Sequence, residues 1–152
     1  ADKIQLILAG KGPQYEKCVK LGEKLANPPQ FVYVQQDELI KLLLQSDLYV
    51  HASDMESEAI SCIEAFATGL VPVIANSELS ATRQFALDDR SLFQPGSPED
   101  LARAIDYWLD NQEEREQMEK TYVKAAKKYS LADSVRLFEE MLNEEIEEKN
   151  KS

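Results

Sequence analysis

Two glutamates, Glu56 and Glu64, lie eight residues apart on either side of a predicted helix start. Carboxylates at this spacing can accept hydrogen bonds from hydroxyl groups at two ends of an extended ligand. The first turn of the helix between them offers backbone N–H groups that lack an acceptor within the helix, and such groups bind anions. The pattern therefore predicts a site for a ligand with a sugar, a diphosphate and a ribose in a row.

Paired carboxylates also suggest hydrolysis of a glycosidic bond, but the spacing disfavours this chemistry. Eight helical residues place the two backbones about 12 Å apart, whereas hydrolytic carboxyl pairs lie about 5–9.5 Å apart. We therefore expect Glu56 and Glu64 to span a ligand. The alternative for Glu56 is a solvated loop acid. Glu64 lies on a helix that the pattern predicts to be buried nearly all round, where an unpaired carboxylate is costly.

Strands and helices are predicted to alternate along the chain, which indicates right-handed βαβ units, a parallel sheet and an α/β fold. The first apolar run is nearly continuous and predicts a strand covered on both faces. Three amphipathic helices are predicted after the last strand, and the whole chain is predicted to form one domain. The predicted strands are residues 4–9, 31–34, 48–52, 71–75 and 91–93. Of the three late helices, the first begins after Ser97, the second covers residues 113–128 and the third covers residues 133–149.

Ligands of parallel sheets bind at the carboxyl ends of the strands. Polar segments follow four of the predicted strands, and we expect them to share one crevice. These segments are residues 10–13, 35–36, 51–58 and 76–83.

Composition excludes several classes of function. The net charge of −11 over 152 residues argues against a nucleic-acid partner, because no surplus of Lys and Arg exists to displace counterions. One histidine and two cysteines make a protein-built zinc site improbable. Cys18 and Cys62 fall on predicted helices, where we interpret them as small core residues in a reducing compartment, with a disulfide as the alternative. With no signal peptide and no membrane segment, the expected location is cytoplasmic.

The segment from Glu56 to Ala75 resembles the signature of retaining, nucleotide-sugar-dependent glycosyltransferases of the group 1 type. Their GT-B fold sets two Rossmann-like domains face to face. The resemblance implies an α/β Rossmann-like parallel sheet with flanking helices and extra C-terminal helices, as in one half of that fold. The residues in register with the family pattern are Ser53, Glu56, Glu64, Ala65, Ala67, Gly69, Pro72, Val73, Ile74 and Ala75.

The resemblance implies a role for each motif residue. Glu56 would bind hydroxyl groups of the donor hexose, and Glu64 would accept hydrogen bonds from the ribose. Backbone N–H groups of Ala59, Ile60 and Ser61 would face the diphosphate. Transfer of this kind works without a protein-bound metal, so no cofactor is expected beyond the nucleoside diphosphate sugar as donor substrate. No residue of this chain is assigned as catalytic.

Further donor-binding candidates lie at the predicted strand ends. The segment from Gly10 to Pro13 is similar to the family's Gly-x-Gly-Pro, and Gln35 follows the strand whose loop abuts the nucleobase in the family. His51 and Ser53 either contact the donor sugar or serve as a structural histidine and a loop cap. Lys11 and Arg83 either bind the diphosphate or are solvated surface residues. The additional candidates are Gly10, Lys11, Gly12, Gln35, His51, Ser53 and Arg83.

The sequence departs from the family pattern in three ways. The family's Gly-Phe-Gly is Ser57-Glu58-Ala59 here, which restricts positive-φ conformations and adds a negative charge beside the expected diphosphate. Val32 replaces the glycine common before the base-contacting loop. The resemblance also implies an earlier strand, with an Arg-x-x-x-x-Lys arrangement, and an N-terminal acceptor domain that this chain lacks. We therefore expect the isolated chain to be inactive, with self-association through an exposed sheet edge.

The function implied is transfer of a hexose, with retention, from a nucleoside diphosphate sugar to a carbohydrate or lipid-linked acceptor. The segment from Glu56 to Ala59 and residues 80–84 are similar to transferases of bacterial capsule or surface polysaccharide assembly. Two alternatives stay open. One is a non-catalytic binding or interaction domain, or a trimmed or redesigned form of that fold, and the other is a nucleotide-sugar epimerase on the same scaffold.

Overall fold

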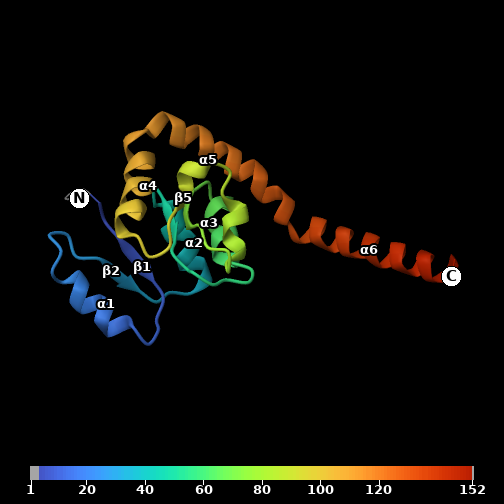
Figure 1. The fold of residues 1–152 in the computed structure, drawn as a ribbon, viewed down its shortest axis with the longest axis horizontal. Helices are drawn as coiled ribbons and strands as arrows, with labels where there is room; N and C mark the ends of the chain where they lie inside the picture. Colours follow the sequence, from blue (N-terminus) through green and yellow to red (C-terminus); the bar gives the residue numbers. More distant parts are fainter. Residues whose placement is uncertain (1–3, 152) are drawn as a thin grey trace. The chain divides into compact units, whose positions relative to one another are not determined.

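The structure is a computed structural model that describes residues 4–151 of the chain (Figure 1). These residues form two compact units, the first ending at Leu42 and the second beginning at Leu43. Each unit has a parallel sheet of its own. We describe each unit by itself, and the prediction of one crevice shared by all the strand ends stays a prediction.

The first unit pairs β1 (Ile7–Ala9) with β2 (Gln30–Val32) in a two-stranded parallel sheet, and α1 (Tyr15–Gly22) connects the two strands. The helix packs on the sheet at both of its ends. The ring of Tyr15 meets the ring of Phe31 edge-on at 5.5 Å between centroids. At Gly22, an added Cβ would lie 2.8 Å from Cδ of Pro29, so this crossing requires glycine.

The first strand is shorter and more exposed than predicted. The sequence predicts a strand over residues 4–9 that is covered on both faces, but β1 has only three residues and its Leu8 and Ala9 are exposed. The side-chain amide of Asn27 donates to the Ile4 carbonyl at 2.6 Å, so a side chain takes the place of a strand partner at this end. Within residues 4–151, β1 also has a single neighbouring strand in its sheet.

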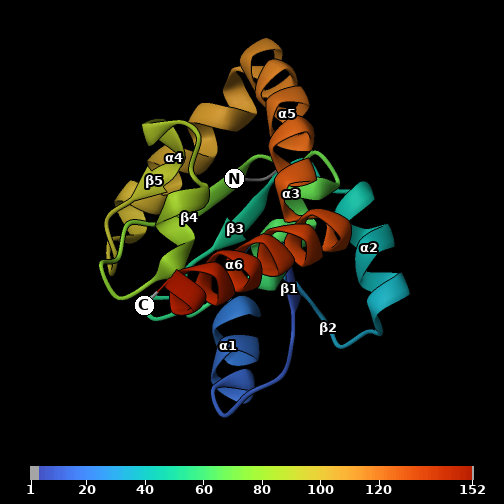
Figure 2. The ribbon, with the colours of Figure 1, turned by 90° about the vertical axis from the view of Figure 1, so that its right-hand side faces the viewer.

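The second unit contains a three-stranded parallel sheet in the order β3–β4–β5 (Figure 2). The strands are β3 (Tyr49–His51), β4 (Pro72–Ala75) and β5 (Leu92–Phe93). All four residues of the central strand are buried, as its nearly continuous apolar sequence predicts. The helix α3 (Ile60–Ala67) connects β3 to β4, and this βαβ unit carries the family-like segment.

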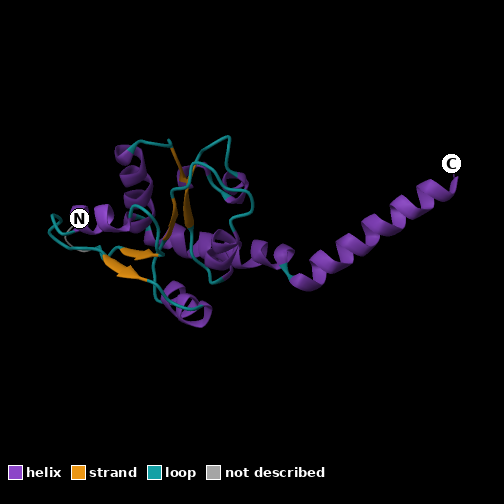
Figure 3. Ribbon diagram, turned by 90° about the horizontal axis from the view of Figure 1, so that it is seen from below, coloured by secondary structure: helices purple, strands orange, loops and turns teal. Residues whose placement is uncertain are grey.

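Several helices and short 3₁₀ turns complete the chain, and Figure 3 shows how short the strands are beside them. Ser97 caps α4 as predicted, because its Oγ accepts a hydrogen bond from the Asp100 N–H at 3.2 Å. The remaining elements are α2 (Gln36–Leu44), η1 (Ala81–Phe85), η2 (Asp89–Ser91), α4 (Pro98–Asp110), α5 (Gln112–Ala126), η3 (Lys127–Tyr129) and α6 (Leu131–Lys151).

The core of the second unit lies where α3, α4 and α5 meet its sheet. Trp108 of α4 and Tyr122 of α5 are buried against apolar residues of β4. Phe66 of α3 contacts the rings of Phe85, Tyr122 and Tyr129, with centroid distances of 5.6, 5.7 and 5.8 Å. These contacts fix α3 to the elements around it, and α3 is the helix whose first turn belongs to the predicted site.

The last helix, α6, drawn in red in Figure 1, carries the predicted amphipathic pattern but buries little of it. Its apolar residues recur at helical spacing, and each exposes more than two-fifths of its surface. The exposed apolar residues of α6 are Leu131, Val135, Leu137, Phe138, Met141, Leu142 and Ile146.

Candidate functional site

The main chain of Glu56 is held by backbone hydrogen bonds to the segment after β4. Glu56 pairs with Ser80 in an isolated parallel bridge. The Glu56 N–H donates to the Leu79 carbonyl at 3.4 Å, and the Ala81 N–H donates to the Glu56 carbonyl at 2.9 Å. The Ser57 N–H donates to Glu56 Oε1 at 3.1 Å. These bonds fix the position of the Glu56 carboxyl group, whose side chain is 33% exposed.

A second anchor holds the same loop two residues earlier. Ser77 Oγ donates to the Asp54 carbonyl at 2.6 Å and accepts from the Leu79 N–H at 3.2 Å. Ser77 itself is buried. The two anchors together attach the loop to residues 77–81, which follow β4, so Glu56 lies at the carboxyl end of the sheet, as predicted.

The helix α3 begins at a strained residue. Ala59, the N-cap position, has φ 51° and ψ 51°, which is the left-handed region that favours glycine. No side chain caps this helix start. The first-turn N–H groups of Ile60 and Ser61 have no acceptor within the helix and lie next to the Glu56 loop in sequence. Of Ser57, Glu58 and Ala59, only Ala59 takes a positive φ, so a single residue bears the cost of the lost family glycines.

The two faces of α3 have different roles. Cys62, Ala65 and Phe66 are buried, whereas Ser61 is exposed and Glu64 is half-buried. The expectation of a helix buried nearly all round is therefore wrong, because the face that begins at Ile60, 60% exposed, is open. Residues three apart on a helix share a face. Ser61 and Glu64 thus lie together on the open side of α3.

A chain of polar contacts connects Ser61 to Glu56 through two residues of β3. Tyr49 and His51 point to the same face of the strand because they are two residues apart. The Tyr49 hydroxyl is hydrogen-bonded to Ser61 Oγ at 3.1 Å and to Nδ1 of His51 at 3.0 Å. His51 Nε2 lies 4.0 Å from Glu56 Oε2. Three of the predicted site residues therefore meet, and Tyr49 joins them.

Burial determines the protonation states of His51 and Tyr49. His51 is 7% exposed, and among the described residues its buried Nε2 has no hydrogen-bond partner. Burial lowers the pKa of His51 below 6.5, and the Glu56 carboxylate opposes this shift only in part. Burial raises the pKa of Tyr49 to about 12, so its hydroxyl keeps its proton. The acidic groups of Cys62, Glu56 and Glu64 add to this rise in the pKa of Tyr49.

Ser53 and Arg83 lie elsewhere in the second unit. Ser53 is half-buried in the loop after β3. Arg83 is exposed on η1 and lines a shallow depression of about 380 Å³ next to the carboxyl ends of β4 and β5. Two acids share this depression, so Arg83 is not in a purely cationic environment. The lining residues are Asn76, Arg83, Asp89, Leu92, Phe93, Gln94 and Asp100.

Four predicted site residues belong to the first unit. Gly10, Lys11 and Gly12 follow β1 directly and are exposed. Gly10 has φ 137° and donates its N–H to the Val32 carbonyl at 2.9 Å, so this turn requires glycine. Gln35 follows β2, and its carbonyl accepts from the Leu39 N–H at 2.9 Å at the start of α2. All four therefore lie at strand carboxyl ends, as predicted.

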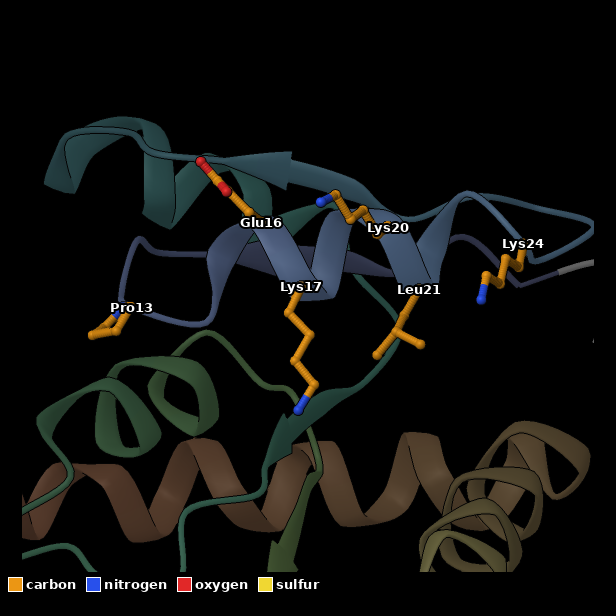
Figure 4. A pocket seen from close by; sticks show the side chains of 6 residues that line it. All are labelled: Pro13, Glu16, Lys17, Lys20, Leu21 and Lys24. Carbon is orange, nitrogen blue, oxygen red and sulfur yellow. The ribbon is translucent and has the colours of Figure 1, made fainter.

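Sequence reasoning missed two features. The sequence pattern predicts Tyr49 only as a strand residue, although its spacing of two from His51 is a signal that they share a face. The other feature is a depression of about 420 Å³ along α1 (Figure 4), lined by Pro13, Glu16, Lys17, Lys20, Leu21 and Lys24. The three lysines follow helical spacing, which is the signal that could have revealed this basic side of α1.

No three or more His, Cys, Asp or Glu side chains of the described residues are grouped to hold a metal ion. No helix in this part of the chain is both long and apolar enough to cross a membrane.

The chain belongs to the family of group 1 glycosyl transferases, whose sequence profile matches residues 1–128. The catalytic domain of a cholesterol-alpha-glucosyltransferase from Helicobacter pylori is 52% identical, with a TM-score of 0.81 over 84% of this chain and 80% of that one. No curated protein matches the chain. The C-terminal, Rossmann-like half of a GT-B fold, which the sequence predicts, is therefore confirmed.

Two more distant structures share the fold. Anabaena Alr3699/HepE, solved in complex with UDP and glucose, is 18% identical with a TM-score of 0.78, and the match covers 92% of this chain and 40% of that one. A chain of the GtfA/B complex is 19% identical with a TM-score of 0.76, and the match covers 93% of this chain and 30% of that one. The chain thus spans less than half the length of these two proteins.

Proposed function

We propose that this chain is the nucleotide-sugar-binding domain of a retaining glycosyltransferase. Its donor is a nucleoside diphosphate hexose, and its acceptor is a carbohydrate or lipid-linked hydroxyl group. A further domain supplies the acceptor site, in line with the share of the two distant structures that the chain spans. Both cysteines are free, which supports a reducing, cytoplasmic location.

One observation carries the proposal. Glu56 and Ser61 are joined through Tyr49 and His51 within the segment that resembles the family signature. The closeness of the Glu56 carboxylate to the start of α3 supports a role for Glu56 with sugar hydroxyl groups and for the helix start with phosphate oxygens. Glu64 lies on the same open face of α3 as Ser61, where it can accept hydrogen bonds from a ribose.

The parts of the site have separate chemical roles. The acceptor oxygen forms its bond to the anomeric carbon on the same face from which the diphosphate departs, so the configuration is retained, and the acceptor proton passes to an oxygen of the departing diphosphate. Negative charge then grows on the diphosphate. The N-terminal end of α3 stabilises this charge through its free N–H groups and its dipole. Glu58 is exposed next to this helix start and disfavours very tight binding of the product.

The similarity to a cholesterol-alpha-glucosyltransferase favours a narrower proposal. At 52% identity, glucose becomes the favoured hexose and a sterol or other lipid hydroxyl the favoured acceptor. Capsule or surface polysaccharide assembly is the second candidate, based on the residues around Glu58 and residues 80–84.

Calorimetric titration with UDP, GDP and ADP, and then with their glucose conjugates, tests the proposal. We expect one nucleotide to bind, and Glu64→Ala to weaken that binding at least tenfold, about 1.4 kcal/mol, through the loss of a charge-assisted hydrogen bond. Glu139→Ala, on the exposed surface of α6, is the matched control and retains the affinity. Absence of binding to all three nucleotides at millimolar concentration would instead favour a non-catalytic interaction domain.

A further inference from the structure

We propose that Tyr49 and His51 form a hydrogen-bond relay through which an anion bound at Ser61 controls the hydrogen bonding of Glu56. His51 is then a positioning residue that acts on Glu56 and does not touch the ligand. The inference rests on the proposed donor site, and it adds a coupling between the phosphate and sugar ends of that site.

The burial of His51 decides how it acts. Its Nε2 is shielded from solvent and, among the described residues, has no hydrogen-bond partner, yet it lies 4.0 Å from Glu56 Oε2. A ligand can reach the half-exposed Glu56 carboxylate but not the buried ring nitrogen behind it. A buried polar nitrogen without a partner is costly. A small movement of the Glu56 carboxylate across this 4.0 Å distance would therefore make or break a hydrogen bond with His51 Nε2.

The hydrogen bonds of the relay can run in either of two directions, because the Ser61 and Tyr49 hydroxyl groups can each donate or accept. We call these two directions the polarities of the relay. In one polarity Ser61 donates to Tyr49, and Tyr49 donates to His51 Nδ1. The neutral imidazole then carries its proton on Nε2, next to the Glu56 carboxylate. An N–H beside a carboxylate is attractive, so we expect this polarity in the protein without ligand.

An anion reverses the relay. Phosphate oxygens accept hydrogen bonds, so the exposed Ser61 hydroxyl donates to them and is no longer available to Tyr49. Tyr49 then donates to Ser61 Oγ, and its oxygen accepts from His51 Nδ1–H; the distances of 3.1 and 3.0 Å allow this polarity as well as the first. The Nε2 lone pair now faces the Glu56 carboxylate, and two acceptors repel each other.

The reversal changes what Glu56 binds. Before the anion arrives, His51 competes for one oxygen of Glu56. Once the anion is bound, that oxygen is released to accept a hydrogen bond from a sugar hydroxyl. The other oxygen stays held by the Ser57 N–H at 3.1 Å. Because coupling between two sites is reciprocal, sugar binding at Glu56 also favours the anion-bound polarity at Ser61.

The single histidine of the chain makes the relay observable by NMR. Long-range ¹H–¹⁵N correlation spectra of the ¹⁵N-labelled chain show which imidazole nitrogen carries the proton. Spectra are recorded without ligand, with whichever of UDP, GDP or ADP binds in calorimetry, and with the matching nucleoside. We expect the proton on Nε2 in the free protein and with the nucleoside, and on Nδ1 with the nucleoside diphosphate.

Two variants interrupt the relay without removing His51. In Ser61→Ala and in Tyr49→Phe, nucleoside diphosphate binding should no longer move the imidazole proton. Ser134→Ala and Tyr129→Phe remove the same groups from α6 and η3 and should retain the switch. Ser61 and Ser134 are exposed, so their variants remain informative if Tyr49→Phe affects folding.

The possible results separate the relay from the proposed function. If a nucleoside diphosphate binds and the His51 nitrogen signals do not change, the relay is overturned and the donor site stands. If the switch persists in Ser61→Ala, the relay is also overturned. If none of the three nucleotides binds at millimolar concentration, the donor site and the relay fall together.

Discussion

The phenolic oxygen of Tyr122 on α5 accepts a hydrogen bond from the backbone N–H of Leu87 at 2.9 Å. The tyrosine is 1% exposed, and its ring also contacts Phe66 of α3. One side chain therefore fastens the segment after η1 and the helix of the candidate site to the same long helix. The contact joins residues 35 positions apart in the sequence, so no local sequence pattern predicts it.

Tyr122→Phe should lower the free energy of unfolding by about 1–3 kcal/mol, because it leaves the Leu87 N–H without its acceptor while the ring still fills its place. Urea unfolding followed by circular dichroism measures this change. Tyr129→Phe is the control, since Tyr129 is 45% exposed and its loss should stay within about 0.5 kcal/mol. Equal effects of the two variants would contradict the prediction.

Stability should fall as the pH drops from about 7.5 to 5.5, in part because of His51. Burial holds the pKa of His51 in the folded protein below the ordinary value of 6.5, so the unfolded chain takes up a proton first. The contribution of neutral His51 to the free energy of unfolding is thus fully present above pH 6.5, and it is lost as the pH falls towards the pKa of His51 in the folded protein. Thermal unfolding across this range measures the slope. His51→Gln should flatten it, and an unchanged slope in that variant would refute this origin.

Only one of the two cysteines should react with a thiol reagent in the native protein. Cys18 is exposed, whereas Cys62 is fully buried and its pKa is raised by burial to about 12. A colorimetric thiol assay should find one rapid equivalent under native conditions and two in denaturant. Cys18→Ser should abolish the rapid reaction. Fast labelling of that variant would show that Cys62 is accessible.

Ala59→Val should destabilise the protein by about 2 kcal/mol or more, because a β-branched residue tolerates a positive φ poorly and the site is buried. Ala59→Gly should stay within about 1 kcal/mol of the parent, since relief of strain offsets the greater entropy of the unfolded chain. Ala67→Val, on the exposed side of the same helix, is the matched control. Chemical denaturation of the three variants distinguishes backbone strain from helix propensity.

The sequence was sufficient for the fold because its local signals agree with one another. The alternation of apolar runs with helical patterns predicts parallel βαβ units, and the Ser97-Pro98 start of α4 is found as expected. Burial and strand length were misjudged in both units, and the open face of α3 is the case in the second unit. The strand expected from Ile4 begins at Ile7, and Cys18 is exposed rather than buried. An eight-residue helix on a two-stranded sheet buries only Gly22, so apolar periodicity overstates its burial.

The candidate site was only partly predictable. Glu56, His51 and Ser61 were chosen from the sequence, and the structure brings them together, while the ligand roles of Glu56 and Glu64 stay predictions. Tyr49 was missed because its role depends on which face of β3 is covered by α3. The packing of α3 on one face of β3 is set by tertiary structure, and it cannot be predicted from the spacing of residues within β3 alone.

The bonds that hold Glu56 have a consequence for how this enzyme family can diversify. They join main-chain atoms of Glu56 to those of Leu79 and Ala81, and the Leu79 side chain is 68% exposed. Almost any residue except proline can supply the same N–H and carbonyl groups. Residues 79 and 81 are thus free to mutate while the carboxylate keeps its position. Evolution can therefore change the side chains around Glu56 without dismantling the main-chain support beneath its carboxylate.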